Sequence, residues 1–127
     1  MTLQFNSQSD FSNFKILSLN LKTEPFNVMV TGEKIFEYRD IKQWSTSRLL
    51  NKDGSPKHYD YVRFQIAYNR TYPYFFCEYK GFEIVNGANF EYSNGLKVKF
   101  NDKRYCIKLG KIHLLGNLQN KIQSKKG

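Results

Sequence analysis

Hydrophobic and polar residues alternate in several short segments of the chain, the pattern of β-strands that bury one face. In residues 15–21, three leucines alternate with Ser18 and Asn20. Gly81 interrupts one of the longer segments, which predicts a bulge at that point. The segments that we predict to be strands are 15–21, 35–40, 61–68, 74–84, 96–100 and 105–109.

One helix is predicted between the first two strands. Pro25 suits its first turn, where a missing N–H group costs little. Phe26, Met29 and Val30 then form one apolar stripe, and Gly32 suits the left-handed residue that follows a helix. The helix is therefore short, and the second strand follows it directly.

Polar segments predict the turns between the remaining elements. Residues 44–50 are predicted to form a second helical turn, and 53–56 and 93–95 are predicted to be surface turns. Residues 101–103 separate the last two alternating segments. This arrangement predicts a hairpin that turns at 101–103.

About six short strands with one or two helices predict an α+β fold. We expect a small PUA-like β-barrel with the helices at its rim, because a closed sheet leaves no exposed strand edge. A chain of 127 residues forms one domain. We expect a flexible N-terminal lead-in at 1–13, the barrel domain at 14–116 and a basic C-terminal tail at 117–127.

Composition narrows the class of protein further. Aromatic residues make up 17% of the chain, which argues against disorder over most of its length. No apolar run approaches the roughly 20 residues of a membrane helix, and the N-terminus lacks a signal-peptide core. Cys77 and Cys106 are too few for a disulfide framework. We therefore expect a cytoplasmic protein with two reduced thiols and no membrane association.

The charge balance favours a polyanionic partner. The chain has 20 Lys and Arg against 11 Asp and Glu, a net charge of +9. Nucleic acid or a nucleotide is the most common partner of so basic a small domain. The alternative is that the excess lysine only keeps the protein soluble.

Metal and cofactor chemistry find no support in the sequence. His58 and His113 lie far apart in the chain, and no zinc-binding spacing or phosphate-binding Walker loop occurs. No serine stands in the turn that presents a hydrolase nucleophile. We expect neither a metal nor another cofactor.

Residues 31–39 bring three ionisable side chains to one corner of the fold. Gly32 ends the helix, so Lys34 lies where the helix meets the strand, and Glu37 and Arg39 share one strand face about 7 Å apart. In one interpretation they line a pocket, where Arg39 binds phosphate or a base edge and Lys34 supplies a charge or a nucleophile. Glu37 then orients them or moves a proton. In the other, the three only satisfy one another as ion pairs.

The spacing Gly32-x-Lys34-x-x-Glu37-x-Arg39 resembles the G-x-K-x-x-E-x-R signature of ASCH domains, small barrels related to the PUA fold of RNA-modifying enzymes. The similarity covers about residues 16–84, and 105–110 loosely, and is nearest to a bacterial and phage branch of the family. Lys80 replaces an arginine of that branch. The segments that carry the similarity are Leu19-x-Leu21-Lys22, Phe26, Tyr38-Arg39, Trp44, Arg48-Leu49, Tyr59-Asp60 and Tyr79-Lys80-Gly81-Phe82.

The resemblance implies binding of RNA or a modified nucleoside beside the motif. Some ASCH proteins hydrolyse the acetyl amide of acetylated cytidine and others cut RNA, which makes Lys34 and Glu37 candidate catalytic residues. In the amidohydrolase branch a threonine nucleophile stands where this chain has Glu37. We expect Glu37 to raise the pKa of Lys34 more than desolvation lowers it, which favours binding over hydrolysis. The sequence leaves open whether the domain is an enzyme.

The candidate substrate-binding residues are Lys22, Arg39, Trp44, Arg48 and Lys80. Trp44, the single tryptophan, either stacks on a base or anchors the core. The cationic members either contact phosphate or are ordinary surface charges. Glu78 or Glu83 is a candidate for a second carboxylate in the pocket, and the sequence does not choose between them.

Overall fold

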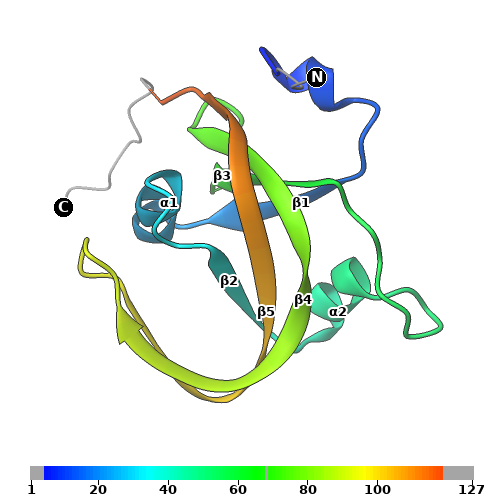
Figure 1. Ribbon diagram of the computed structural model, residues 1–127, viewed down its shortest axis with the longest axis vertical. Helices are drawn as coiled ribbons and strands as arrows, with labels where there is room; N and C mark the ends of the chain where they lie inside the picture. The colour runs from blue at the N-terminus through cyan, green and yellow to red at the C-terminus, as the bar shows by residue number, and fades with distance from the viewer. Residues whose placement is uncertain (1–4, 68, 119–127) are drawn as a thin grey trace.

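The protein has an α+β fold, seen here in a computed structural model that describes residues 5–67 and 69–118 (Figure 1). These residues form a mixed sheet of five strands with the order β1-β3-β4-β5-β2, together with two α-helices. The elements are a 3₁₀ helix (Gln8–Phe11), β1 (Ile16–Leu21), α1 (Thr23–Val30), β2 (Phe36–Asp40), α2 (Gln43–Leu49), β3 (Tyr61–Ile66), β4 (Tyr74–Glu91) and β5 (Lys97–Gly116).

The helices and the first strands follow the predicted pattern. Gly32 follows α1 with a φ of +86°, the left-handed conformation expected of it. Gly81 has a φ of +90° and lies at a register shift between Tyr79 and Phe82, which confirms the predicted bulge. Tyr68, predicted as the end of the third strand, lies outside the described residues.

The sheet is open rather than closed, so the expected barrel is not confirmed. β1 pairs in parallel with β3, β2 pairs antiparallel with β5, and among the described residues no backbone pairing joins β1 to β2. A side chain spans the gap instead, because the Arg39 guanidinium on β2 donates to the Asn20 carbonyl oxygen on β1 at 2.7 Å. The two edge strands are therefore held together without forming a ladder.

The predicted hairpin with its turn at 101–103 is wrong. β5 runs without interruption from Lys97 to Gly116, and it pairs with β4 through a turn that Tyr92 and Leu96 close. Residues 101–103 lie at a register shift of the β4–β5 pair, so the polar triplet marks a bulge. A bulge leaves a residue without a backbone partner and bends the strand. Polar side chains at such a position remain in contact with water. The described strands consequently number five, not about six.

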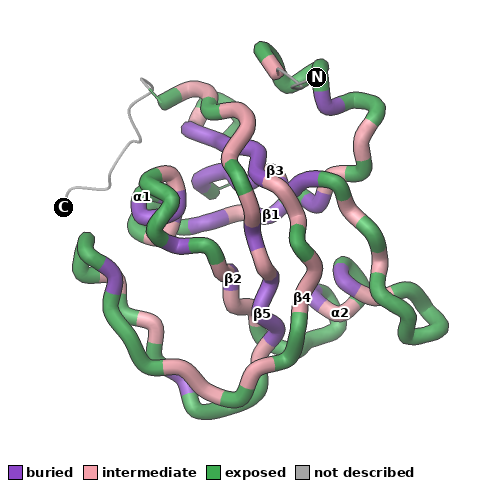
Figure 2. The backbone as a smooth tube through the Cα atoms, in the orientation of Figure 1, coloured by how far each residue is buried: buried purple, intermediate pink, exposed green. Residues whose placement is uncertain are grey.

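The main core lies between α1 and the curled sheet, where the buried segments gather in Figure 2. Phe26 of α1 contacts Phe75 of β4 with ring centroids 5.1 Å apart. Burial of these large apolar side chains is the chief stabilising contribution to such a domain. Other members of this core are Leu17, Leu19, Met29, Leu49, Val62, Phe64 and Ile107.

The N-terminal segment forms a second, smaller core on the other part of the sheet. Phe11 is 2% exposed, stacks on Phe76 at 3.9 Å and contacts the edge of Tyr61 at 5.0 Å. The structure thus gives this segment a 3₁₀ helix and a buried side chain, while the flexibility of the predicted lead-in at 1–13 stays a prediction. The polar composition of this segment did not indicate that Phe11 packs into a core with Tyr61 and Phe76. Residues 1–4 and, in the predicted basic tail, 119–127 lie outside the described residues.

Candidate functional site

The structure brings Lys34, Glu37 and Arg39 together as the motif predicts. Lys34 lies in the connection between α1 and β2, and its Nζ is 3.6 Å from Oε1 of Glu37. Arg39 lies two residues further along β2 and donates from Nε to the other carboxylate oxygen of Glu37 at 2.7 Å. Glu37 is only 7% exposed, so its carboxylate is divided between two cations away from water.

Lys34 is the most enclosed of the three side chains. Its side chain is 3% exposed and donates to the carbonyl oxygen of Phe36. The rings of Tyr38 and Tyr92 lie 5.3 and 5.6 Å from its Nζ, within cation–π range. The Ile35 carbonyl oxygen accepts from the backbone N–H of Leu109 on β5. Successive carbonyl groups of a strand point to opposite sides, so the Phe36 carbonyl points away from β5, to the unpaired edge of β2. The ammonium group thus covers a strand edge as well as binding Glu37.

Burial has the larger effect on the pKa of Lys34. Desolvation lowers this pKa below its ordinary value of 10.5, and the attraction of Glu37 raises it by less. The expectation that Glu37 outweighs desolvation is therefore wrong in direction. The reason is the enclosure by Tyr38 and Tyr92, which removes the ammonium group from water.

Arg39 is the member of the cluster that reaches the surface, with a side chain 24% exposed. It borders a small hollow beside α2, and Trp44 and Arg48 border the same hollow. Trp44 is 47% exposed, which excludes the alternative that it anchors the core. The Arg48 guanidinium carbon lies 4.2 Å from the centroid of the Trp44 ring. An aromatic face and two guanidinium groups therefore meet on one surface.

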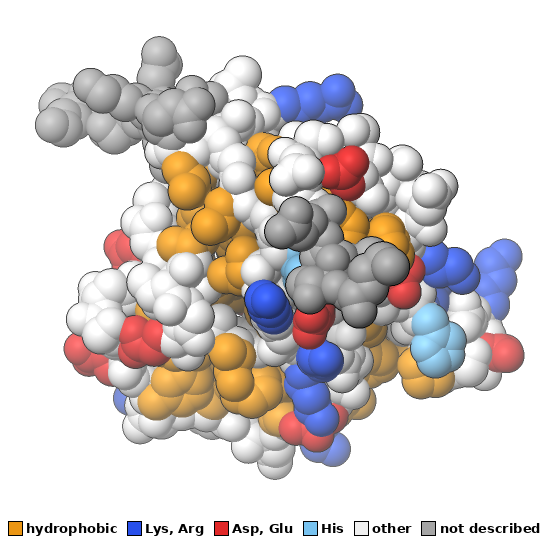
Figure 3. Space-filling view, turned by 45° about the horizontal axis from the view of Figure 1, so that its top comes forward, with side chains coloured by type: hydrophobic (Ala, Val, Ile, Leu, Met, Phe, Trp, Pro, Cys, Tyr) orange, Lys and Arg blue, Asp and Glu red, His pale blue; other side chains and the backbone are white. Residues whose placement is uncertain are grey.

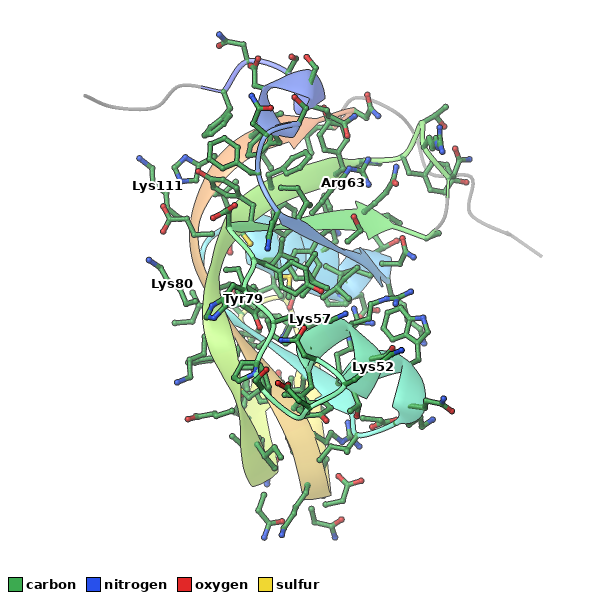
Figure 4. All side chains as sticks on the ribbon, turned by 90° about the vertical axis from the view of Figure 1, so that its right-hand side faces the viewer. Lys52, Lys57, Arg63, Tyr79, Lys80 and Lys111 are labelled. Atoms are coloured by element: carbon green, nitrogen blue, oxygen red, sulfur yellow. The ribbon has the colours of Figure 1, made fainter. Side chains whose placement is uncertain are left out.

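Neither Lys22 nor Lys80 borders this hollow. Lys22 is exposed at the start of α1 and, among the described residues, forms no ion pair with the cluster. Lys80 lies on β4, pairs with Glu78 at 3.2 Å and borders a separate cavity of about 460 Å³. Figure 4 shows Lys80 and Tyr79 on β4, with Lys57 of the α2–β3 connection on the same side of the molecule.

Neither candidate for a second carboxylate pairs with the cluster. Oε2 of Glu78 lies 2.7 Å from Nε2 of His113, and this contact is the main cause of the lowered pKa of Glu78. Glu83 pairs with Lys108 at 3.4 Å. Both carboxylates are thus committed to neighbours on β4 and β5.

A further cavity, of about 390 Å³, lies between the end of α1 and β5. Lys34 and Lys111 border it, while most of its lining is apolar, including Met29, Ile35 and Leu109. Sequence reasoning missed the β5 residues here, because only the β4–β5 register places them opposite α1. Tyr92 was missed for the same reason.

The thiols and the acidic side chains give no sign of other chemistry. Cys77 and Cys106 are both buried and unpaired with each other, and burial raises the pKa of Cys77 to about 12. Such a thiol stays protonated and unreactive. In the part of the chain that the structure describes, no group of three or more His, Cys, Asp or Glu side chains is placed to hold a metal ion.

Comparison with known proteins assigns no family. No family model matches the chain, and neither a curated protein nor a solved structure is significantly similar to it. Across the described residues, none of the helices has the length and hydrophobicity to span a membrane.

Proposed function

We propose that the protein is an ASCH-like domain that binds single-stranded RNA, and that Arg39, Trp44 and Arg48 form the contact surface. The observation that carries this proposal is the exposed Trp44 ring with Arg48 on its face and Arg39 at the same hollow. Base stacking on such a ring contributes about 1–3 kcal/mol per base.

Each residue has a distinct role in this proposal. Trp44 stacks on a base, and the guanidinium groups of Arg39 and Arg48 bind phosphate oxygens, for which their planar fork is suited. Glu37 holds Nε of Arg39 at 2.7 Å and leaves part of the guanidinium group at the surface. Lys34 and Glu37 thus position Arg39 rather than contact the RNA. The net charge of +9 attracts the phosphate backbone over a longer range.

A PUA-like architecture and a cytoplasmic location are part of the same proposal. Arg39 bridges the two edge strands, so the open sheet resembles a PUA-like barrel closed by a side chain. Two buried, reduced thiols and an RNA ligand both fit a cytoplasmic protein.

Fluorescence anisotropy of a labelled single-stranded RNA tests the proposal. Trp44→Ala and Arg48→Ala should each weaken binding by about 5- to 150-fold, equivalent to 1–3 kcal/mol. Lys80→Ala is the matched control, because Lys80 is exposed but already paired with Glu78. Affinity should also fall with salt, with a log–log slope near −0.7 per phosphate contacted. Equal affinities for all variants, or no binding at low salt, contradict the proposal.

Hydrolysis of a nucleobase amide or of RNA is a second candidate function. It is favoured by the cavity of about 390 Å³ that Lys34 borders, together with the lowered pKa of Lys34. Against it, the Lys34 side chain is only 3% exposed and its ammonium group is enclosed. Incubation with acetylated cytidine and with RNA decides the matter: turnover that Lys34→Met abolishes establishes the hydrolase, and its absence leaves the binding domain.

A further inference from the structure

The far end of the β4–β5 hairpin is a two-stranded ribbon that no third strand supports. We call residues 87–102 the strap. β3 pairs with β4 only as far as Glu78, and β2 pairs with β5 only from Arg104 onward. Figure 1 shows the strap curling away from the sheet and back toward α1. Isolated two-stranded ribbons are marginally stable, so the contacts of the strap with the domain decide its position.

The strap begins at a break in the ladder. The β4–β5 register shifts between Asn86 and Ala88, and Gly87 between them has a φ of +85°. A Cβ atom at Gly87 would lie 3.3 Å from the carbonyl oxygen of Phe100 on the facing strand. β4 and β5 therefore approach closely at Gly87, opposite residues 101–103. Glycine tolerates the positive φ that this position requires. Such a bulge disrupts the ladder locally and suits a hinge.

Few contacts hold the strap against the domain. Phe90 and Phe100 lie against the Tyr38 ring, with centroids 6.2 and 5.3 Å apart. At the tip, the backbone N–H of Ser93 donates to Glu33 at 2.9 Å, and the Ser93 hydroxyl bonds the same carboxylate. Both bonds are exposed to water, where a hydrogen bond contributes little net stability.

A second tip bond joins the strap to α1. The side-chain amide of Asn94 donates to the Glu24 carbonyl oxygen at 3.1 Å, also at an exposed position. The side of the strap that faces the domain carries Tyr92, which is 9% exposed and lies 5.6 Å from Nζ of Lys34. The strap thus supplies one wall of the enclosure around Lys34.

We propose that the strap opens at the Gly87 bulge while the rest of the fold stays intact, and that this opening gates access to Lys34 and Glu37. Opening removes Tyr92 from Lys34 and admits water and ligand groups to the ammonium group. The use of the opened site rests on hydrolysis, the second candidate function, but the opening itself is measured without any ligand. Segments held by few buried contacts are those that open locally in native proteins.

Mass spectrometry of lysine acetylation under native conditions tests the gate. The test variant is Glu33→Ala with Asn94→Ala, which removes both acceptors of Ser93 and the Asn94 amide, and so all three tip bonds, while it keeps the aromatic packing. In wild type, Lys34 should react far more slowly than exposed Lys15, which lies outside the strap and is the internal reference. In the test variant the rate at Lys34 should rise several-fold, with the rate at Lys15 unchanged.

The matched control is Asp53→Ala with Asn51→Ala. In a turn remote in sequence from the strap, the Asp53 carboxylate accepts from the backbone N–H and the hydroxyl of Ser55, at 3.0 and 2.6 Å, as Glu33 accepts from Ser93. The Asn51 amide donates to the Pro56 carbonyl oxygen at 3.4 Å, as Asn94 donates to Glu24. This variant should leave the rate at Lys34 unchanged. Hydrogen exchange of the strap amides should also be faster than that of β3 in wild type.

Two results overturn the gate. One is an unchanged rate at Lys34 in the tip variant. The other is exchange of the strap amides as slow as that of β3, which means that Lys34 is exposed only by global unfolding. Neither result touches RNA binding at Trp44, and loss of RNA binding leaves the labelling result intact. The two proposals therefore fail separately.

Discussion

Two neighbouring tyrosines differ in the partners of their hydroxyl groups. The rings of Tyr59 and Tyr79 contact edge to face, with centroids 5.4 Å apart. The Tyr59 hydroxyl donates to the carbonyl oxygen of Arg48 at 2.5 Å, and so fixes the segment before β3 to α2. Among the described residues, the Tyr79 hydroxyl is the one buried side-chain polar atom without a hydrogen-bond partner. Buried polar groups without partners destabilise the folded state.

We expect opposite outcomes when each hydroxyl is removed. Tyr59→Phe should lower the free energy of unfolding by about 1 kcal/mol, because a hydrogen bond is lost. Tyr79→Phe should leave it unchanged or raise it by up to about 1 kcal/mol. Urea denaturation of both variants at neutral pH measures the difference. Equal losses in the two variants mean that the Tyr79 hydroxyl has a partner.

The pH dependence adds a second readout for Tyr79. Burial raises the pKa of Tyr79 from 10 to about 12, so the unfolded chain loses this proton first as the pH rises. Tyr79 therefore costs the folded state stability between about pH 10 and 12. The Phe variant should lose less stability than wild type across this window.

At the same scale, the motif predicts which charged residues meet but not how deeply they are buried. Glu37 and Arg39 are two residues apart on one strand, so their contact follows from strand geometry alone. The enclosure of Lys34 depends on Tyr92, whose position follows from the curl of the distant hairpin. The spacing of residues in the motif contains no information on that curl. For this reason the sequence did not predict that the pKa of Lys34 is lowered.

At the scale of elements, local patterns predict helices and strand ends better than pairing. The stripe of α1 and the alternation of β1 place these elements within a residue or two. The polar residues 101–103 signal a turn locally, yet the pairing of β5 with β4 along most of its length overrides them. Likewise the polar segment before β1 folds because the sheet offers Phe11 an apolar face.

The burial of Phe11 makes the N-terminal segment part of the folded unit. Phe11→Ala should lower the free energy of unfolding by about 3 kcal/mol, near the lower end of the usual cost of deleting a buried phenylalanine. Leu115→Ala is the control, since Leu115 is 42% exposed and should cost well under 1 kcal/mol. Thermal or urea unfolding of the two variants makes the comparison. A negligible cost at Phe11 means that the segment detaches from the sheet in solution.

At the scale of the whole molecule, the positive charge does not gather in one patch on the face that Figure 3 shows. Lysine and arginine side chains occur there at several separate places, some of them beside aspartate or glutamate. A general attraction to polyanions follows from such a distribution, while a contact of defined geometry needs a particular surface. Described cations without an ion pair include Lys22, Arg48, Lys57, Lys97, Lys99 and Lys111.

The fluorescence of Trp44 tests RNA binding at the proposed surface most directly. Trp44 is the single tryptophan of the chain, so the indole emission reports on this one site. Titration with a single-stranded RNA should quench the emission with the same dissociation constant that anisotropy gives, and added salt should reverse the quenching. Arg48→Ala should shift the titration to higher RNA concentrations, and Lys80→Ala should not. RNA that binds by anisotropy yet leaves the Trp44 emission unchanged contradicts the account.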